Sequence, residues 1–326
     1  MTKRLLAFIL LGALAPGLHA AEDVTAAAGL SFPSIQDGAG ARAIALGSTY
    51  VGIDEGSTAL FWNPAGLGAL ADTEIAENHN SAILNSTQDI AVVALPLGGD
   101  NGLGMSLNYE NDGSFDGRDQ NGNATGGYSA NAYGGSLGWG AGVADGLYVG
   151  LDLKFEQENL AGTDLDSFAG DFGALWNCSP YLSLGAAYTN VGPTVEGWHL
   201  DQGLNLGLSS HFYTSDSSQW LAAVSGESLH DGESSVHFGL EDTLYTLLSL
   251  RAGYSYSDSN DDTSNLMGWT FGIGLAIHQL SLDYAYVPLS DLGSMQRVSL
   301  SYAFGGPEPQ APADAPQAQP TTNTQQ

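Results

Sequence analysis

The chemistry open to this sequence depends on a few cations among many carboxylates. Lys and Arg number 7 in 326 residues, against 36 Asp and Glu, and the formal net charge is −29. Lys154, Arg251 and Arg297 each alternate with apolar neighbours, so we expect them on the polar faces of strands. A cation held away from bulk water needs a carboxylate partner. The carboxylates expected on the same polar faces are Asp152, Glu156, Asp171, Glu241 and Asp283.

Arg42 lies apart from these cations, in a segment that is rich in Gly, Ala, Ser and Thr. Small residues let a backbone pack closely inside another structure, so we interpret this segment as a plug. We predict that Arg42 pairs with one or more of the carboxylates named above and pins the plug. The alternative is that all of these charged groups are hydrated pore lining.

The same segment ends in an aromatic run and a turn, Phe61-Trp62-Asn63-Pro64. Pro64 fixes its own φ and pushes Asn63 out of the helical region, so the pair turns the chain. We expect Asn63 to cap or turn the chain at the entrance of a barrel and Trp62 to pack between plug and wall. Direct contact with a ligand is the alternative for both residues.

Enzymatic and metal-binding patterns are weak in this sequence. No G-x-S-x-G elbow occurs, the histidines are scattered without metal-ligand spacing, and the single Cys178 has no partner for a disulfide. Two acidic stretches begin like calcium loops, but the first has Asn123 where Glu is needed and the second has Thr263 where Gly is needed. The sequence therefore predicts no catalytic residues, no metal and no cofactor. A hydrolase with a serine in the lumen or at the rim is the remaining enzymatic alternative.

Residues 1–20 have the features of a secretory signal peptide. Lys3 and Arg4 precede the apolar run Leu5–Leu14, and small residues follow at Ala20 and Ala21. This run is too short to span a bilayer as a helix, so we expect export from the cytoplasm and membrane crossing by strands. The strongly negative charge also argues against nucleic acid as a partner, because phosphate binding needs a surplus of Lys and Arg.

Period-two alternation of apolar and polar residues begins after the Asn-Pro turn. One such stretch places Leu151, Leu153 and Phe155 on one face and Asp152 and Lys154 on the other. The whole pattern predicts fourteen strands, at 73–80, 87–97, 102–112, 128–139, 146–158, 166–177, 181–190, 202–212, 218–226, 234–241, 247–257, 266–277, 279–287 and 295–304.

The links between these segments alternate in length. Every second link is short, whereas 113–127, 191–201 and 258–265 are longer and more polar. Short turns on one side and long loops on the other are typical of outer-membrane barrels. The sequence therefore predicts an all-β fold, a 14-stranded antiparallel transmembrane β-barrel with an N-terminal plug.

Four regions follow from these observations. Residues 1–20 form the leader, 21–70 the plug and Asn-Pro turn, and 71–304 the outer-membrane barrel. Residues 305–326 are rich in Pro, Gln and Ala and are expected to form a flexible tail on the periplasmic side. This tail is either a tether to a periplasmic partner or a solvated end without a function.

The stretch GARAIALGSTYVGIDEGSTALFWNPAGL, residues 40–67, resembles the start of the PorV/PorQ family within the FadL-like outer-membrane barrels. Ala41-Arg42, Gly47 and the run from Phe61 to Leu67 match that family in order and spacing. The resemblance implies fourteen strands with an N-terminal plug in the outer membrane of a Gram-negative bacterium. The last strand also resembles a barrel-assembly signal, with Tyr302 and Phe304 as terminal aromatics but Ser299 where glycine is usual.

Two functions follow from the resemblance. FadL-like members carry small hydrophobic molecules across the outer membrane, whereas PorV-like members are non-transporting accessory proteins of type IX secretion and surface attachment. The expected partners are outer-membrane lipids together with either a hydrophobic small molecule or secreted and periplasmic proteins. This chain is shorter than typical FadL transporters, and no residue set for a fatty-acid pocket is evident in it.

Overall fold

A computed structural model describes residues 38–53, 55–82, 86–119, 121–195, 199–258, 268–289 and 293–305. The expected leader, the first part of the expected plug and the tail after residue 305 lie outside the described residues. The described chain forms one closed barrel of fourteen antiparallel strands, in which each strand pairs with its sequence neighbours and β1 pairs with β14. The predicted fold class is therefore confirmed.

The strands agree closely with the ranges expected from alternation. They are β1 (Thr73–Ser81), β2 (Thr87–Pro96), β3 (Asn101–Arg118), β4 (Ala124–Ala144), β5 (Leu147–Leu160), β6 (Thr163–Ser179), β7 (Leu182–Val191), β8 (Gly203–Thr214), β9 (Ser218–Leu229), β10 (Ser234–Leu244), β11 (Leu248–Ser257), β12 (Trp269–Ile277), β13 (Leu280–Pro288) and β14 (Ser294–Phe304).

The barrel is apolar on its outer surface and polar on its inner surface. On β5, the outward Leu153 is 58% exposed, whereas the inward Asp152 and Glu156 are fully buried. On β10, Val236 and Phe238 point outward and His237 points inward. A soluble sheet would bury the first set of residues and expose the second, so this arrangement requires lipid around the barrel.

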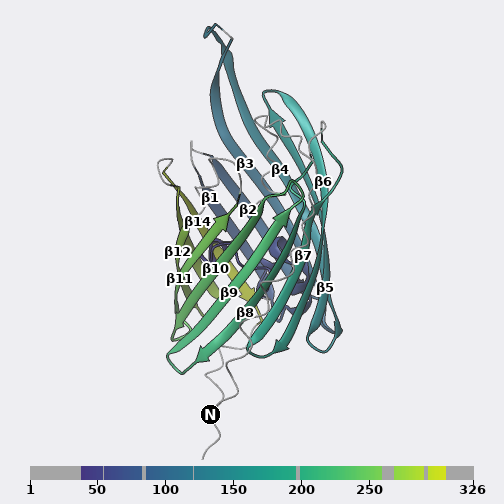
Figure 1. Cartoon of the computed structure of the whole chain (residues 1–326), viewed down its shortest axis with the longest axis vertical. Coiled ribbons are helices and arrows are strands. Elements are labelled where there is room, and N and C mark those ends of the chain that lie inside the picture. The colour runs from purple at the N-terminus through teal and green to yellow at the C-terminus, as the bar shows by residue number, and fades with distance from the viewer. Residues whose placement is uncertain are drawn as a thin grey trace, which may run out of the picture.

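The long links predicted from composition are partly wrong. Residues 113–127 were expected as a loop, but β3 continues to Arg118 and β4 begins at Ala124, so only 119–123 connect them. Figure 1 shows this hairpin rising beyond the other strands. Gly and Asn lower strand propensity, but the antiparallel ladder of the barrel continues past a bulge near Gly113. The link between β5 and β6, on the same side, is only 161–162.

The hairpin between β3 and β4 is closed by side-chain contacts. Asp119 accepts hydrogen bonds from the backbone N–H groups of Asn121 and Asn123, at 2.9 and 2.8 Å. The rings of Phe115 and Tyr128 stack across the two strands, with centroids 5.4 Å apart. These local contacts explain why a polar, glycine-rich stretch forms a regular ribbon.

The segment before β1 lies inside the barrel (Figure 1). It contains the short helix α2 (Ala41–Ala45), the short helix α3 (Ala59–Trp62) and the 3-10 helix η1 (Pro64–Ala69). Helix α2 packs against β11 to β14, and η1 packs against β2 to β6. The segment therefore spans the lumen between two parts of the wall. None of the helices in the described ranges is long and apolar enough to cross a membrane.

Candidate functional site

Small residues allow α2 to lie directly on the barrel wall. Ala41, Ala43 and Ala45 are fully buried, and an added Cβ at Gly272 of β12 would lie only 2.4 Å from Cβ of Ala45. Close approach of this kind needs glycine on the wall and alanine on the helix. The helix ends at Ala45, Leu46 is its C-cap, and Gly47 follows with φ of +71°. This turn brings the chain back across the lumen.

Arg42 is the only residue of α2 with a charged side chain, and it binds the wall. Its Nε and Nη2 atoms donate to the two carboxylate oxygens of Glu241 on β10, at 2.9 and 2.8 Å. Its Nη1 atom donates to Glu55, a residue of the plug itself. Arg42 therefore joins the plug to the wall through a two-pronged contact, which fixes direction as well as distance. Glu241 is one of the five partners that the sequence suggested.

Glu241 is shared between the plug and the neighbouring strand. Arg251 on β11 is its direct cross-strand partner and donates through Nε to the same carboxylate. Arg251 also donates through Nη1 to Asp283 of β13, at 2.5 Å. The result is a network that runs from α2 through β10 and β11 to β13. The side chains of Glu241 and Arg251 are only 6% and 5% exposed, so solvent screens this network little.

The phenol of Tyr50 completes the surroundings of Arg42. Its ring lies 5.8 Å from the guanidinium carbon, and its hydroxyl donates to the backbone oxygen of Glu55 at 3.0 Å. Burial raises the pKa of Tyr50. Burial alone would lower the pKa of Arg42, but the carboxylates of Glu241 and Glu55 hold it well above its usual value. Arg42 is therefore a permanent cation.

Hydroxyl groups of the wall hold the backbone of the plug at four further points. Ser209, Ser255 and Thr270 donate to plug carbonyl oxygens, and Ser299 accepts from a plug N–H. The bonds are Ser209 Oγ to Gly52 O at 2.7 Å, Ser255 Oγ to Gly47 O at 2.9 Å, Thr270 Oγ1 to Ala45 O at 3.0 Å and Ala41 N to Ser299 Oγ at 2.7 Å. Sequence reasoning missed these contacts. The one sequence feature that pointed to these contacts was the period-two alternation, which places the hydroxyls on the inner face of the strands.

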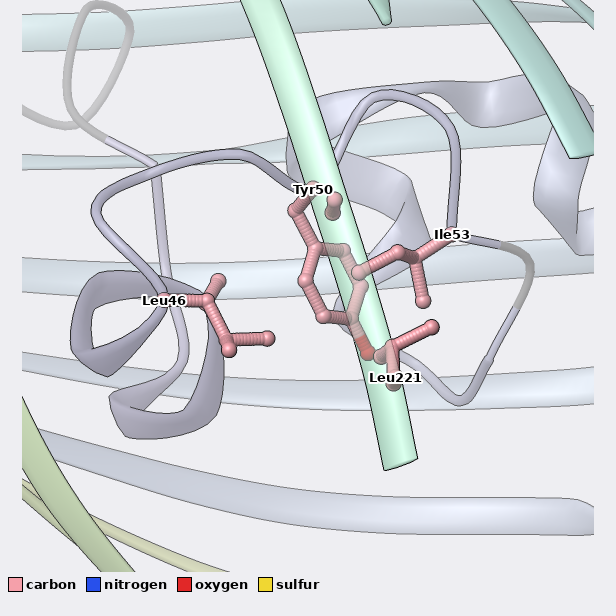
Figure 2. Close-up of a cluster of buried hydrophobic side chains, with 6 residues drawn as sticks. Leu46, Tyr50, Ile53 and Leu221 are labelled. Atoms are coloured by element: carbon pink, nitrogen blue, oxygen red, sulfur yellow. The ribbon is translucent and has the colours of Figure 1, made fainter. Parts of the chain in front are cut away.

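The core of the plug is apolar and includes one wall residue. Leu46, Tyr50 and Ile53 of the plug surround Leu221 of β9, which is 2% exposed (Figure 2). Trp62 packs against this cluster, and its Nε1 atom donates to the carbonyl of Ala39 at 2.8 Å. Trp62 thus lies among plug and wall residues.

The aromatic-Asn-Pro run fastens the second half of the plug. Phe61 packs against an apolar cluster that includes Leu60, Leu67 and Val92. The side-chain nitrogen of Asn63 donates to two backbone oxygens, Val51 O at 2.8 Å and Ala174 O on β6 at 3.0 Å. Its side-chain oxygen accepts from the N–H of Ala65 at 3.2 Å and caps η1, in which Pro64 is the first residue.

The remaining charged residues form a second group on the other side of the lumen. Lys154 of β5 lies 2.7 Å from Asp171 of β6 and donates to the side-chain oxygen of Asn190 at 3.0 Å. Asp152 and Glu156 flank Lys154 on the same inward face of β5. The eight charged lumen residues predicted from the sequence therefore do not form one network. Arg297 of β14 donates to the carbonyl of Gly38, at the start of the described part of the plug.

Two cavities lie beside the plug, near the end of the barrel that carries the short turns. One has a volume of about 350 Å³ and is bounded by Arg42, Glu241, Arg251 and Asp283 together with hydroxyls of the wall. The other has a volume of about 690 Å³ and extends from Ile53 towards the turn between β6 and β7. Across the described ranges, no three His, Cys, Asp or Glu side chains are placed to hold a metal ion.

Among known proteins, the similarity of this chain is to solved structures and concerns the fold. No family model matches the chain, and no curated protein matches it either. Among solved structures, the Pseudomonas putida toluene transporter TodX aligns over 83% of this chain and 99% of its own, with 14% identity and a TM-score of 0.64. The Ralstonia pickettii toluene transporter TbuX aligns over 83% and 98%, with 15% identity and a TM-score of 0.59. The monoaromatic hydrocarbon channel CymD aligns over 82% and 96%, with 13% identity and a TM-score of 0.56. At such low sequence identities, these alignments show that the chain shares the architecture of the three proteins, and they show no more than that.

Proposed function

We propose that this chain is a FadL-like outer-membrane channel that passes small hydrophobic molecules across the outer membrane, past its own N-terminal plug. One observation carries the proposal. The barrel holds its N-terminal segment in the lumen, and nearly the whole length of each neighbouring hydrocarbon transporter aligns with this architecture. The apolar outer surface fits outer-membrane lipids, and the leader fits export from the cytoplasm.

The way in which the plug is held suits a movable part. Many of its polar links to the wall are single hydrogen bonds, for example from Ser209 and Ser255. The exceptions are the two-pronged contact of Arg42 with Glu241 and the paired bonds from the N–H and hydroxyl of Ser57 to Glu74 of β1. Each single bond contributes only about 0.5–1.5 kcal/mol. The cavities of about 350 and 690 Å³ give the plug space on the side of the short turns. Partial release of the plug would join the lumen to these cavities and open a path.

The accessory role in protein secretion remains the alternative raised by the sequence resemblance. We do not favour it, because the solved structures named above are described as transporters or channels. The connections at the outer end do not decide between the two roles: 119–123, 161–162 and 230–233 are short, whereas 192–202 and 258–268 are longer.

A reversible lock on the plug tests the proposal. Cβ of Leu46 lies 3.0 Å from the position of an added Cβ at Gly239 on β10, near the spacing of about 3.5–4.5 Å in a disulfide. The added Cβ would also lie 2.6 Å from Cγ2 of Thr49 and 2.7 Å from the carbonyl oxygen of Leu46, so Gly239→Cys shifts this contact, and the oxidised double variant is therefore compared with its own reduced form. We would introduce Leu46→Cys and Gly239→Cys in a Cys178→Ser background. Uptake of labelled toluene would then be measured in cells whose outer membrane contains lipopolysaccharide, because plain phospholipid lets hydrocarbons pass unaided.

We expect slow uptake when the lock is oxidised and faster uptake after a mild reductant breaks it. The two single-cysteine variants serve as controls and should not respond to the reductant. Equal uptake in both redox states, with the disulfide verified by mass spectrometry, would exclude passage by movement of this part of the plug. Uptake no faster than in cells without the protein would exclude the transport function.

A further inference from the structure

Ionisable side chains form a strip on the outer surface of the barrel, on β1 and β2. Glu77 and His79 alternate along β1 with the buried Asn78, so both point outward. Asp89, the direct cross-strand partner of His79 on β2, points outward beside it. The side chains of His79 and Asp89 are each 48% exposed. Charged groups on a lipid-facing surface are costly, so a strip of this kind is expected to have a function.

Glu77 lies within the apolar band of the wall. Its cross-strand partners are Leu300 on β14 and Ala91 on β2. The next outward residue of β1 towards the inner end is Ile75, which pairs with the outward aromatic Tyr302 of β14. Glu77 is therefore surrounded on three sides by residues that suit lipid. The hydrocarbon of a bilayer offers its carboxyl group no hydrogen bond.

The strip has one polar group of each kind left over. Nδ1 of His79 lies 2.6 Å from Oδ1 of Asp89, so one ring nitrogen is engaged and Nε2 remains for another partner. Glu77 makes no hydrogen bond or ion pair with another described residue. A carboxyl group and an imidazole nitrogen complement each other in either ionisation state. The carboxylic acid donates to the neutral ring, and the imidazolium donates to the carboxylate.

A two-fold axis along the membrane normal makes this strip complementary to itself. Glu77 and His79 are two residues apart, about 7 Å along β1. On a strand tilted by about 40°, this spacing corresponds to about 5 Å in depth. The axis keeps the depth of every residue, and the facing strands of the two copies tilt in opposite directions. With the axis between the two residues, His79 of the second copy therefore lies directly above Glu77, within reach of its side chain.

We propose that two copies of this barrel associate in the outer membrane through β1 and β2, with the carboxyl group of Glu77 in each copy bonded to Nε2 of His79 in the other. The contact is reciprocal, so the bond forms twice. Ala91 lies beside Glu77 and is small, which lets the second wall approach closely. Each barrel keeps its own lumen and plug, so this inference goes beyond the transport function and does not depend on it.

Counting barrels in phospholipid bilayers tests the inference. The single Cys178, near the end of β6, would carry a fluorophore, and stepwise photobleaching would count the copies in each diffusing spot. We expect the parent to change from single barrels to pairs as the protein-to-lipid ratio rises. Glu77→Leu and His79→Leu should each raise the ratio at which pairs form by at least about tenfold, because each change removes both reciprocal bonds.

A mixture of the two variants gives a result that only a reciprocal contact predicts. Pairs of Glu77→Leu copies contain no carboxyl–imidazole bond, and neither do pairs of His79→Leu copies. A mixed pair retains one bond, from the intact Glu77 of one copy to the intact His79 of the other. With the variants labelled in two colours, we expect mixed pairs to form at a protein-to-lipid ratio about threefold below that of either variant alone.

Asp242→Leu is the matched control, because it removes an acidic side chain from the outward face of β10, far from the strip. It should leave pairing unchanged. Folding of each variant would be checked by the heat-dependent shift of its band in electrophoresis. If His79→Leu does not fold because Asp89 loses its partner, the double variant with Asp89→Asn takes its place with the same expected result. In dilute bilayers lipid surrounds the strip, so Glu77→Leu should weaken the pair without weakening the single barrel.

Three results would overturn the proposal. Single bleaching steps for the parent at every ratio would show that no second copy covers the strip, and would leave another membrane protein as its partner. Unchanged pairing in both folded leucine variants would place the interface elsewhere on the wall. Mixed pairs that form no more readily than pairs of one variant would exclude the reciprocal bond.

Discussion

Arg42 contacts two carboxylates that differ in burial, and this difference decides which one holds the plug. The side chain of Glu241 is 6% exposed and that of Glu55 is 42% exposed. An exposed ion pair contributes little, because water screens the charges and both side chains lose entropy. The contact with Glu241 is shielded and two-pronged, so it should carry most of the anchoring.

Replacing Arg42 with Ala should therefore loosen the plug and leave the barrel folded. Two charge-assisted hydrogen bonds to Glu241 are lost, while Arg251 still compensates that carboxylate. We expect docking of the plug to weaken by about 3 kcal/mol. Hydrogen exchange of the α2 amides and current fluctuations in planar bilayers would measure the change. Glu55→Gln should weaken docking of the plug by less than about 1 kcal/mol in both measurements. An equal effect of the two variants would contradict this ranking.

At the residue scale, the sequence predicted a set of carboxylates that could pair with Arg42, but not which of them Arg42 binds. Charge balance limited the candidates to inward carboxylates, and Glu241 was among them. The choice depends on the position of α2 relative to β10, which is set by tertiary packing. The contacts of Ser255 and Thr270 with plug carbonyls were invisible for the same reason. Inward serines line any polar lumen, so their type alone does not distinguish a plug contact.

At the scale of elements, inward glycines shape the wall where the plug lies against it. An added Cβ at Gly185 of β7 would lie 1.9 Å from the carbonyl oxygen of Val51, and one at Gly253 of β11 would lie 2.1 Å from the nitrogen of Gly47. These atoms belong to backbone and cannot turn aside. The glycines are therefore needed for the fit between wall and plug, and not for strand formation, which they weaken.

We therefore expect Gly185→Ala to expel the plug from its seat. An overpacked contact of this kind typically costs about 1–3 kcal/mol. Protection of plug amides and resistance of the plug to protease should fall, while the strands keep their circular dichroism. Gly226→Ala on the outward face of β9 controls for the effect of the same change on a strand away from the plug, because its nearest neighbour would be 3.7 Å away. An undisturbed plug in Gly185→Ala would show that the plug does not rest on this part of the wall.

The hairpin of β3 and β4 is an independent extension of the barrel. β2 stops pairing with β3 at Asn111, and β5 begins pairing with β4 at Ala130. Replacing residues 114–129 with a two-residue Asn-Gly turn should thus leave assembly and stability of the barrel within about 0.5 kcal/mol of the parent. The heat-dependent shift in electrophoresis and a urea titration in vesicles would check this. Loss of the folded band would show that the hairpin is needed to close the barrel.

The strands were predictable because lipid outside and polar groups inside impose one strict alternation along every strand. The hairpin was not, because outside the membrane this constraint ends and composition becomes the only local signal. Gly, Asn and Asp between 113 and 127 suggested a loop. The register of the barrel below and the stacked Phe115 and Tyr128 overrode that propensity. The pairing of distant strands is a property of the closed sheet and leaves no mark on a short window of sequence.

For the whole molecule, the outer surface departs from the apolar pattern on β1 and β2. Glu77 of β1 points outward, and its cross-strand partners are Leu300 on β14 and Ala91 on β2. The next outward residue of β1, His79, pairs with Asp89 at 2.6 Å. On β13, which pairs with the far side of β14, the outward positions are aliphatic or aromatic. An acidic side chain on the lipid face destabilises a barrel, though less than a basic one does.

Glu77→Leu should consequently stabilise the folded barrel by about 1–2 kcal/mol, because it restores the lipid-facing pattern. The same change on the inner face of the barrel, Glu156→Leu on β5, should destabilise the folded barrel, since Glu156 is fully buried among polar groups of the lumen. Denaturant unfolding in phospholipid vesicles would compare both variants with the parent. Opposite signs for two acid-to-leucine changes in the same barrel, one on β1 and one on β5, cannot arise from net charge, which changes equally in both. They follow only if the membrane surrounds the first side chain and the polar lumen surrounds the second. A loss of stability in Glu77→Leu would mean that this strip of β1 and β2 faces polar groups instead of lipid.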